Sequence, residues 1–185
     1  ELTTYPCFQA LKEAVEGFEH SLPLFSSLGS DTMRPRHWYQ LEELSGVKID
    51  TNAATFNLKT LFEMQLHRFQ DRIMSMMEIS RGEAGIEKSL LEIASYWKKV
   101  DFVARPYKGD ASKGYLLDDP TDILVQIEDN AMTLASMSQS PYATAHARQL
   151  RLWESDLTLV SDCITAWRTV QMKWTYLAGI FMDSD

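Results

Sequence analysis

Histidines are the first residues to consider for chemistry, because they act in metal sites and in proton transfer. The chain has four of them: His20, His37, His67 and His146. None has a glutamate three positions before it, the spacing with which a di-iron helical bundle binds its metal, and no H-E-x-x-H zinc helix occurs. Glu16 with His20, and Glu63 with His67, are each four residues apart and can meet on a helix surface. Such pairs are more typical of a solvated helix face than of a metal site.

One glycine-spaced segment has to be tested as a nucleotide site. Gly109 and Gly114 have the outer spacing of a phosphate-binding loop, but Tyr115 and Leu116 stand where that motif needs lysine and then serine or threonine. Without that lysine and hydroxyl, nothing supplies charge for the terminal phosphates or a ligand for Mg²⁺. The segment is also predicted to be a hairpin tip rather than a strand-to-helix turn. The sequence therefore argues against nucleotide binding here.

Clustered carboxylates are the remaining chemical candidates. Asp118, Asp119 and Asp122 stand where a helix is predicted to begin. Capping and favourable charge near a helix amino end account for them, with a Ca²⁺ site as the alternative. Glu42 and Glu43 are adjacent, so on a helix they point in different directions and suit a solvated face. Nothing resembles a nucleophile elbow. We predict no catalytic residue, no cofactor site and no metal site.

Composition and charge restrict the kinds of partner. Hydrophobic residues make up 45% and charged residues 24% of the 185 positions, as in packed soluble proteins. The net charge of −8 disfavours nucleic acid and anionic membrane, and no apolar run approaches the roughly 18 residues of a membrane span. Cys7 and Cys163 lack the spacing of a metal knuckle or redox pair, which indicates isolated thiols in a reducing compartment. The chain opens on Glu1 rather than methionine, and we interpret it as a piece of a longer polypeptide.

The first elements are predicted to be helices joined by a short loop. Apolar residues three or four positions apart form one helical stripe: Phe8, Leu11, Val15, Phe18 and Leu22. Pro23 lacks the amide needed to continue a helix, so we expect this one to end there. A second helix is expected to begin at a cap on Asp31 or Thr32 and to end at Gly46. Its inner face is predicted to comprise Trp38, Leu41 and Leu44.

Glycines are predicted to divide the next helical region in two. A long helix is expected from about Asn57, and Gly82 and Gly85 are expected to end it. The inward residues of this long helix are predicted to be Leu58, Phe62, Leu66, Phe69, Ile73 and Met76. A shorter helix should follow, ending near Val100, with Ile86, Leu90, Ala94 and Trp97 on its inner face.

The second half is predicted to contain one hairpin and two helices. Short β-prone runs at 102–105 and 115–117 flank a glycine- and lysine-containing tip at 108–114. A helix should begin after Asp119. From 143 to 182 one uninterrupted helix is expected, about 60 Å long at 1.5 Å per residue. A sphere of this chain length is only about 40 Å across, so we expect an elongated molecule.

Some residues in these stripes leave two interpretations open. The five tryptophans and the cluster of Met74, Met76 and Met77 either form the core or provide an exposed docking surface. Asn130 and Gln171 occupy otherwise apolar stripes, where they either fix the register between helices or mark a face turned to solvent or a moving neighbour.

Several segments, in order along the chain, resemble the linker region of dynein heavy chains. The first is R-P-R-H-W-Y-Q-L at 34–41, similar to the family's R-x-R-H-W-x-x-L. The others that carry the resemblance are 56–58 with Leu61, Leu66, His67 and Phe69; 86–90 with Trp97; the hairpin from Phe102 to 116–117; I-E-D-N at 127–130; and Trp153, Trp167, 170–171, Trp174, 176–177 and 180–181. The resemblance covers about residues 20–185, and the ending at 181–185 is more similar to axonemal than to cytoplasmic dyneins.

This resemblance implies a function that composition alone does not reveal. A dynein linker is a helical lever that lies across the ring of AAA modules and bends and straightens as the ring hydrolyses ATP. The implied partners are the AAA ring of the same heavy chain and, indirectly, microtubules, with no nucleic acid and no membrane. The implied location is the cytoskeleton, in a cilium or flagellum axoneme. The hairpin tip near 108–113 and the loop at 46–56 are candidates for contact with the ring.

The predicted fold class is all-α: an elongated multi-helix bundle with a small β-hairpin and a long C-terminal helix. We expect one structural unit over 1–185, with an N-terminal helix and loop at 1–30, helices at 31–100, the hairpin at 101–118 and two helices at 119–185. The alternative function is a spectrin-like or solenoid adaptor that binds partner proteins on its helical faces. A fully buried Trp167 predicts a loss of about 3–5 kcal/mol on Trp167→Ala, whereas a small loss would identify it as a docking residue.

Overall fold

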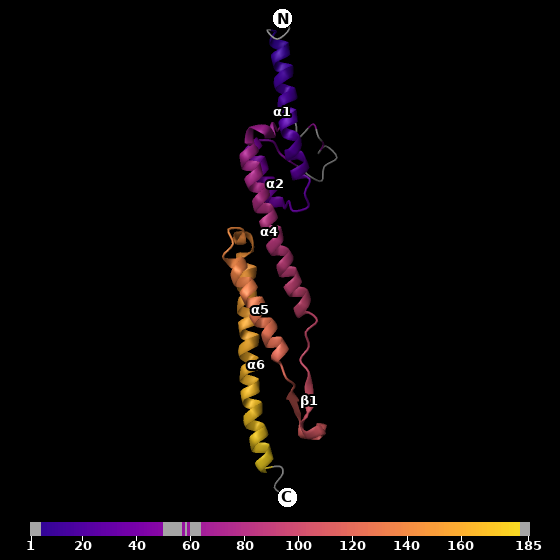
Figure 1. The fold of residues 1–185 in the computed structure, drawn as a ribbon, viewed down its shortest axis with the longest axis vertical. Helices are drawn as coiled ribbons and strands as arrows, with labels where there is room; N and C mark the ends of the chain where they lie inside the picture. The colour runs from indigo at the N-terminus through magenta and orange to yellow at the C-terminus, as the bar shows by residue number, and fades with distance from the viewer. Residues whose placement is uncertain (1–4, 50–56, 58, 60–63, 182–185) are drawn as a thin grey trace. The chain divides into compact units, whose positions relative to one another are not determined.

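The computed structural model describes residues 5–49, 57, 59 and 64–181. Helices dominate it, with a single antiparallel two-stranded hairpin among the described residues (Figure 1). The predicted all-α class with a small hairpin and a long C-terminal helix is confirmed. The chain divides into two compact units, 1–85 and 86–185, and the single structural unit expected over 1–185 stays a prediction. The elongated outline stays a prediction.

The first helix of the first unit, α1 (Pro6–Leu28), continues through Pro23, so the prediction that it ends there is wrong. An internal proline costs a helix about 3 kcal/mol. Beyond it, however, Leu24 and Leu28 are almost completely buried, and burying two leucines returns a free energy of similar size. The Ser27 hydroxyl also donates to the Pro23 carbonyl at 3.0 Å. Tertiary packing therefore outweighs the local preference.

The apolar stripe predicted on α1 is helical in its period but mostly faces outward. Leu11 and Val15 are more than half exposed, and the buried residues of α1 are instead Ser21, Leu24 and Leu28. The core of this unit forms where the last turns of α1 meet α2 and the first half of α4. Its buried residues are Leu24, Leu28, Leu41, Met64, Leu66, Ile73, Met76 and Met77.

Helix α2 (Pro35–Ser45) ends at Gly46, as predicted, where φ is 70°. Its start differs from the prediction: the N-cap is Arg34, and Asp31 and Thr32 lie in the loop before it. Of the expected inner residues, Leu41 is fully buried and Trp38 packs partly buried against the core.

Helix α4 (Gln70–Trp97) runs uninterrupted through Gly82 and Gly85, so the predicted break is wrong. Each internal glycine weakens a helix by about 1 kcal/mol relative to alanine. Buried side chains before and after the glycines offset that cost: Ile73, Met76, Met77 and Ser80 in the first unit, and Ile86, Leu90 and Ile93 in the second. The helix is also preceded by a 3-10 turn, η2 (Leu66–Phe69), instead of beginning near Asn57. Residues 58 and 60–63 of the predicted helix lie outside the described part.

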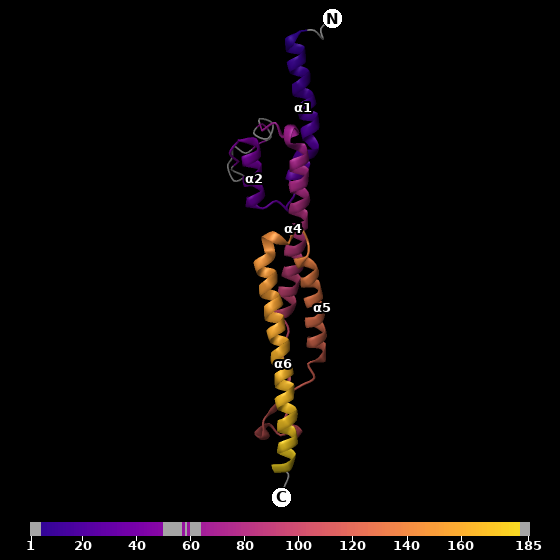
Figure 2. The ribbon, with the colours of Figure 1, turned by 90° about the vertical axis from the view of Figure 1, so that its left-hand side faces the viewer.

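The second unit contains the hairpin and a pair of helices. Strands β1 (Ala104–Pro106) and β2 (Tyr115–Leu117) pair antiparallel. The predicted tip contains two 3-10 turns, η3 (Tyr107–Gly109) and η4 (Ala111–Lys113). Helix α5 (Thr121–Ser138) and helix α6 (Ala147–Phe181), linked through the 3-10 turn η5 (Ala143–His146), lie side by side in both views (Figures 1 and 2).

Helix α6 has 35 residues, or about 52 Å at 1.5 Å per residue, slightly shorter than predicted. The buried core that α5 and α6 share with the end of α4 comprises Ile86, Leu90, Ile93, Ile127, Leu134, Ala143, Leu150, Leu157 and Ile164. Asp119 precedes Pro120, the N-cap of α5. Its carboxylate accepts from the Thr121 amide at 3.2 Å and from the Thr121 hydroxyl at 2.6 Å, and so it pairs the first amide of the helix.

Two glycines allow a direct test of the continuous α4. A Cβ added at Gly85 or at Gly46 would meet no atom within 4 Å, but Gly46 has φ of 70° and Gly85 lies inside the helix. We expect Gly85→Ala to raise the free energy of unfolding by about 0.5–1 kcal/mol. Gly46→Ala should lower it by about 1–2 kcal/mol because of the left-handed backbone. Urea denaturation measures both, and an equal loss for the two variants would contradict an uninterrupted α4.

Candidate functional site

The histidines singled out in the sequence do not gather in the structure. His20 is exposed, with Nδ1 2.6 Å from the Glu16 carbonyl. His67 lies against Gly17 of α1, where an added Cβ would stand 3.1 Å from the ring; its predicted neighbour Glu63 is outside the described residues. Within the described ranges, no three His, Cys, Asp or Glu side chains come close enough to hold a metal ion. Cys7 and Cys163 are both free and exposed.

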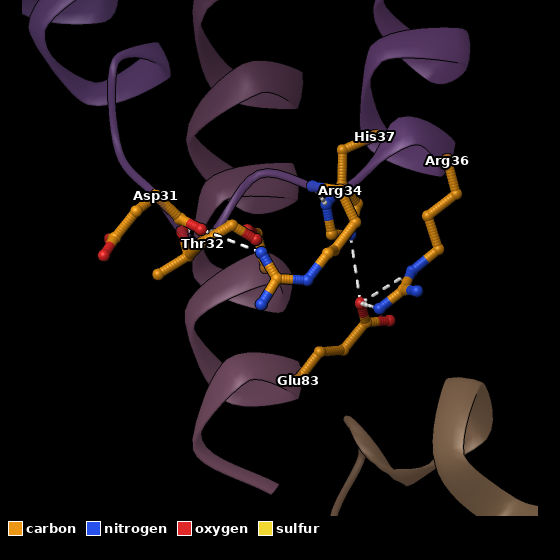
Figure 3. Close-up of polar contacts among 7 residues, drawn as sticks. Asp31, Thr32, Arg34, Arg36, His37 and Glu83 are labelled. Atoms are coloured by element: carbon orange, nitrogen blue, oxygen red, sulfur yellow. Dashed lines mark hydrogen bonds and ion pairs between the residues drawn. The ribbon is translucent and has the colours of Figure 1, made fainter. Parts of the chain in front are cut away.

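His37 is the histidine that takes part in a buried polar cluster. It is 1% exposed and sits on α2, facing α4 (Figure 3). Its Nε2 lies 3.0 Å from Oε2 of Glu83, a residue of α4 that is itself buried. The Arg36 guanidinium donates to the same Glu83 oxygen from Nε at 2.9 Å and also from its terminal nitrogen. One carboxylate oxygen thus accepts from two neighbouring residues of α2.

The backbone determines the protonation of His37. The Arg34 amide donates to Nδ1 of His37 at 3.1 Å, so Nδ1 is an acceptor and carries no proton. The ring proton is therefore on Nε2, which donates to Glu83. This neutral tautomer satisfies both ring nitrogens and also pairs the N-cap amide of α2.

Burial lowers the pKa of His37 below its ordinary value, and this is the largest influence on it. The Glu83 carboxylate opposes the shift, whereas the positive charges of Arg36 and Arg34 add to it. The hydrogen bonds point the same way, because a second ring proton would face the Arg34 amide, another donor. The fold therefore favours neutral His37.

The loop before α2 is attached to α4 by hydroxyl groups. The fully buried Ser80 hydroxyl lies 2.8 Å from the Thr32 carbonyl and 3.0 Å from the Thr32 hydroxyl. The Arg34 guanidinium donates to the Asp31 carbonyl at 2.8 Å (Figure 3). Together with Glu83, these contacts fix both the start of α2 and its loop on one face of α4.

The cluster is suited to holding helices together rather than to catalysis. The acceptor oxygen of Glu83 already takes donors from Arg36 and His37, and the His37 ring is inaccessible to a substrate. Sequence reasoning missed Glu83, which lies 46 residues from His37. No local pattern marks Glu83, because its partner is so distant along the chain.

A second polar contact ties the hairpin to α6. The Gln171 side chain accepts from the Leu117 amide at 2.7 Å and donates to the Leu117 carbonyl at 2.8 Å. Beside it, the rings of Tyr107 and Trp174 meet edge to face with centroids 4.8 Å apart. Neither interpretation of Gln171 describes this contact, because its partner is the strand β2 rather than another helix.

Asn130 is buried on α5. Its Oδ1 lies 3.4 Å from Nε2 of Gln126, and its Nδ2 has no hydrogen-bond partner among the described residues. Asn130 thus faces the interior, but it does not bridge two helices through a hydrogen bond within the described part of the chain.

The neutral His37 predicts a pH dependence of stability. The His37 side chain of the unfolded chain takes up a proton as pH falls through about 6.5, whereas that of the folded chain does so only at lower pH. The contribution of His37 to the free energy of unfolding is therefore fully present above about pH 6.5 and is lost progressively below it. The contribution of one proton approaches about 1.4 kcal/mol per pH unit. Urea denaturation between pH 5 and 8 measures it. His37→Gln should flatten this dependence, and identical profiles for wild type and His37→Gln would exclude the assignment.

The Gln171 contact predicts a local loss on truncation. Gln171→Ala leaves the amide and carbonyl of the buried Leu117 without their partner, which should lower the free energy of unfolding by about 1–3 kcal/mol. Hydrogen exchange at the Leu117 amide should also accelerate. Gln149→Ala, on an exposed position of the same helix, is the matched control and should change stability by no more than about 0.5 kcal/mol. Equal effects of both variants would show that the contact contributes nothing.

Comparison with known proteins gives a consistent result along the chain. The model of the family described as "Dynein heavy chain, N-terminal region 2" matches residues 1–185. The chain is 36% identical over its whole length to the dynein-1-alpha heavy chain of the flagellar inner arm I1 complex of Chlamydomonas reinhardtii. It is 32% identical over 95% of its length to human dynein axonemal heavy chain 10.

The chain spans only 4% of the length of each of these relatives. Within the described residues, no helix combines the length and the hydropathy that crossing a bilayer requires. Because the family model matches every residue from 1 to 185, the chain belongs to the dynein heavy chain family, within the N-terminal region of those proteins.

Proposed function

We propose that this chain is part of the mechanical linker of an axonemal dynein heavy chain. In this role it transmits the ATP-driven conformational change of the AAA ring into movement along microtubules. The observation that carries the proposal is the match of the whole chain to the N-terminal region of dynein heavy chains. The names of the relatives, which are axonemal or flagellar dyneins, favour a cilium or flagellum as its location.

The structure has features that a lever needs. Helices α4 and α6, of 28 and 35 residues, supply long elements whose backbone hydrogen bonds resist bending. The Glu83 cluster attaches α2 to α4, and the Gln171 contact attaches the hairpin to α6. Fixed contacts of this kind let each unit respond to a load as a body instead of deforming element by element.

The ATP-hydrolysing site and the microtubule-binding site are assigned to other parts of the heavy chain. The partners are then the AAA ring of the same polypeptide and, indirectly, the microtubule. A nucleotide-dependent lever must make different contacts in its two states. The hairpin tip, which carries exposed Lys108 and Lys113, is our candidate for one such contact. The other candidate, the loop at 46–56, falls mostly outside the described residues.

Family membership argues against the spectrin-like adaptor. The two functions also differ in what the parent gene must encode. A linker requires a G-x-x-x-x-G-K-[ST] loop downstream, followed by further AAA modules, whereas an adaptor requires further helical repeats.

The lever proposal is tested by kinking α6 in the parent heavy chain. Thr165 is exposed and lies near the middle of α6. Thr165→Pro removes a helical hydrogen bond and bends the helix, whereas Thr165→Ala leaves it straight. We expect Thr165→Pro to slow microtubule gliding several-fold while microtubule-stimulated ATP turnover stays near wild type, and Thr165→Ala to change neither. Unchanged gliding speed in the kinked variant would contradict a lever role.

A further inference from the structure

His37 is a buried side chain of the one residue type that ordinarily changes its charge between pH 5 and 8. Both of its ring nitrogens are engaged: Nδ1 accepts from the Arg34 amide at 3.1 Å, and Nε2 lies 3.0 Å from the Glu83 carboxylate (Figure 3). A second ring proton must therefore go to Nδ1. There it faces the N–H of Arg34, and a hydrogen bond cannot form between two donors. Protonation of His37 is thus incompatible with the present geometry at the start of α2.

The surroundings of His37 do not compensate a second ring proton. Burial is the largest reason that the pKa of His37 lies below its ordinary value, and the positive charges of Arg36 and Arg34, from α2 and its N-cap, act in the same direction. Glu83 of α4 attracts the proton, but the oxygen that faces the ring already accepts two hydrogen bonds from Arg36. Within the described part of the chain, these are the charged groups that act on His37. A cationic His37 is therefore more stable where its ring reaches water.

Contacts on either side of His37 limit how far a movement of its ring spreads. Before the first turn of α2, the Ser80 hydroxyl of α4 donates to the Thr32 carbonyl at 2.8 Å. After that turn, Leu41 is fully buried in the core of the first unit. Neither contact involves a group that titrates between pH 5 and 8. The segment that responds to protonation is therefore the first turn of α2, at 34–38.

We propose that His37 and Glu83 form a pH-operated catch, which is closed at neutral pH and releases the first turn of α2 from α4 in mild acid. Protonation of histidines at pH 5–6 opens interfaces in known pH sensors. Release lets water reach the cationic ring and Glu83 while Leu41, Ile73 and Met77 keep the core packed, so it requires less free energy than unfolding. The inference stands apart from the lever proposal, because the turn can open whether or not the linker transmits force.

Amide hydrogen exchange of the intact heavy chain, followed by mass spectrometry with residue resolution, tests the catch. The Arg34 amide donates to His37, and the amides of His37 and Trp38 donate to the Arg34 carbonyl, so all three report on the release. We expect their protection factors, which correct for the intrinsic effect of pH on exchange, to fall about tenfold between pH 7.5 and 5.0. The amides of Ile73 and Met77 should keep theirs. Constant protection at 34–38 would overturn the proposal, as would an equal loss at Ile73 and Met77.

Variants of the neighbouring charges separate the titration of His37 from a general effect of acid. The loss of protection grows with the difference between the pKa of His37 in the released state and in the closed state. Glu83→Gln removes the charge that favours protonation in the closed state, so it should enlarge the loss. Arg36→Gln removes a charge that opposes protonation there, so it should reduce the loss. Equal losses in the two variants, or changes of the opposite sign, would overturn the proposal.

His37→Gln supplies a side chain at the same position that does not titrate. Its protection at 34–38 should be the same at pH 7.5 and 5.0, and a persisting loss in acid would overturn the proposal. If this variant does not fold, the opposite effects expected of Glu83→Gln and Arg36→Gln still decide between a catch and a structural contact.

Discussion

The carboxylate of Glu83 is the acceptor on which the order of the first unit depends. It is buried on α4 and takes hydrogen bonds from His37 and Arg36 of α2. A buried carboxylate is costly unless it is paired and hydrogen-bonded. Any arrangement that moves α2 away from α4 leaves that charge unpaired. The same carboxylate holds His37 in the tautomer that pairs the N-cap amide of α2, so the start of the helix and its packing are fixed together.

The proposed lever function gives these contacts a mechanical role, which is to keep neighbouring elements from moving under load. Glu83 lies between Gly82 and Gly85, the weakest turn of α4 by intrinsic preference. The contact with α2 adds tertiary stabilisation there, and within the second unit Ile86 and Leu90 of the same helix are buried. In that unit, Gln171 satisfies both backbone groups of Leu117 and keeps the hairpin on α6. Polar contacts thus fix elements that shared apolar packing alone would allow to slide.

Much of the fold could be predicted from sequence, because several elements have strong local signals. Gly46 ends α2 with a left-handed backbone, and the two strands of the hairpin flank a glycine-containing tip. Helix α6 coincides with a long stretch that has no glycine before Gly179. The errors occur where tertiary packing overrides local preference, at Pro23 and at the glycines of α4. The polar cluster was not predictable, since the pairing of His37 with Glu83 joins residues 46 positions apart. The apolar residues of α6 divide between a buried set (Leu150, Leu157 and Ile164) and an exposed set (Trp167, Val170 and Phe181), because period alone does not reveal how many neighbours a helix has.

The most direct test of the account is a double-mutant cycle between His37 and Glu83. The free energies of unfolding of His37→Ala, Glu83→Ala and the double variant are compared with wild type at pH 7.5. Removing either partner leaves the other buried without its hydrogen bond. The sum of the two single losses should therefore exceed the loss of the double variant, by a coupling energy of about 1–3 kcal/mol. Losses that add, with a coupling energy near zero, would contradict a fold organised around the Glu83 carboxylate.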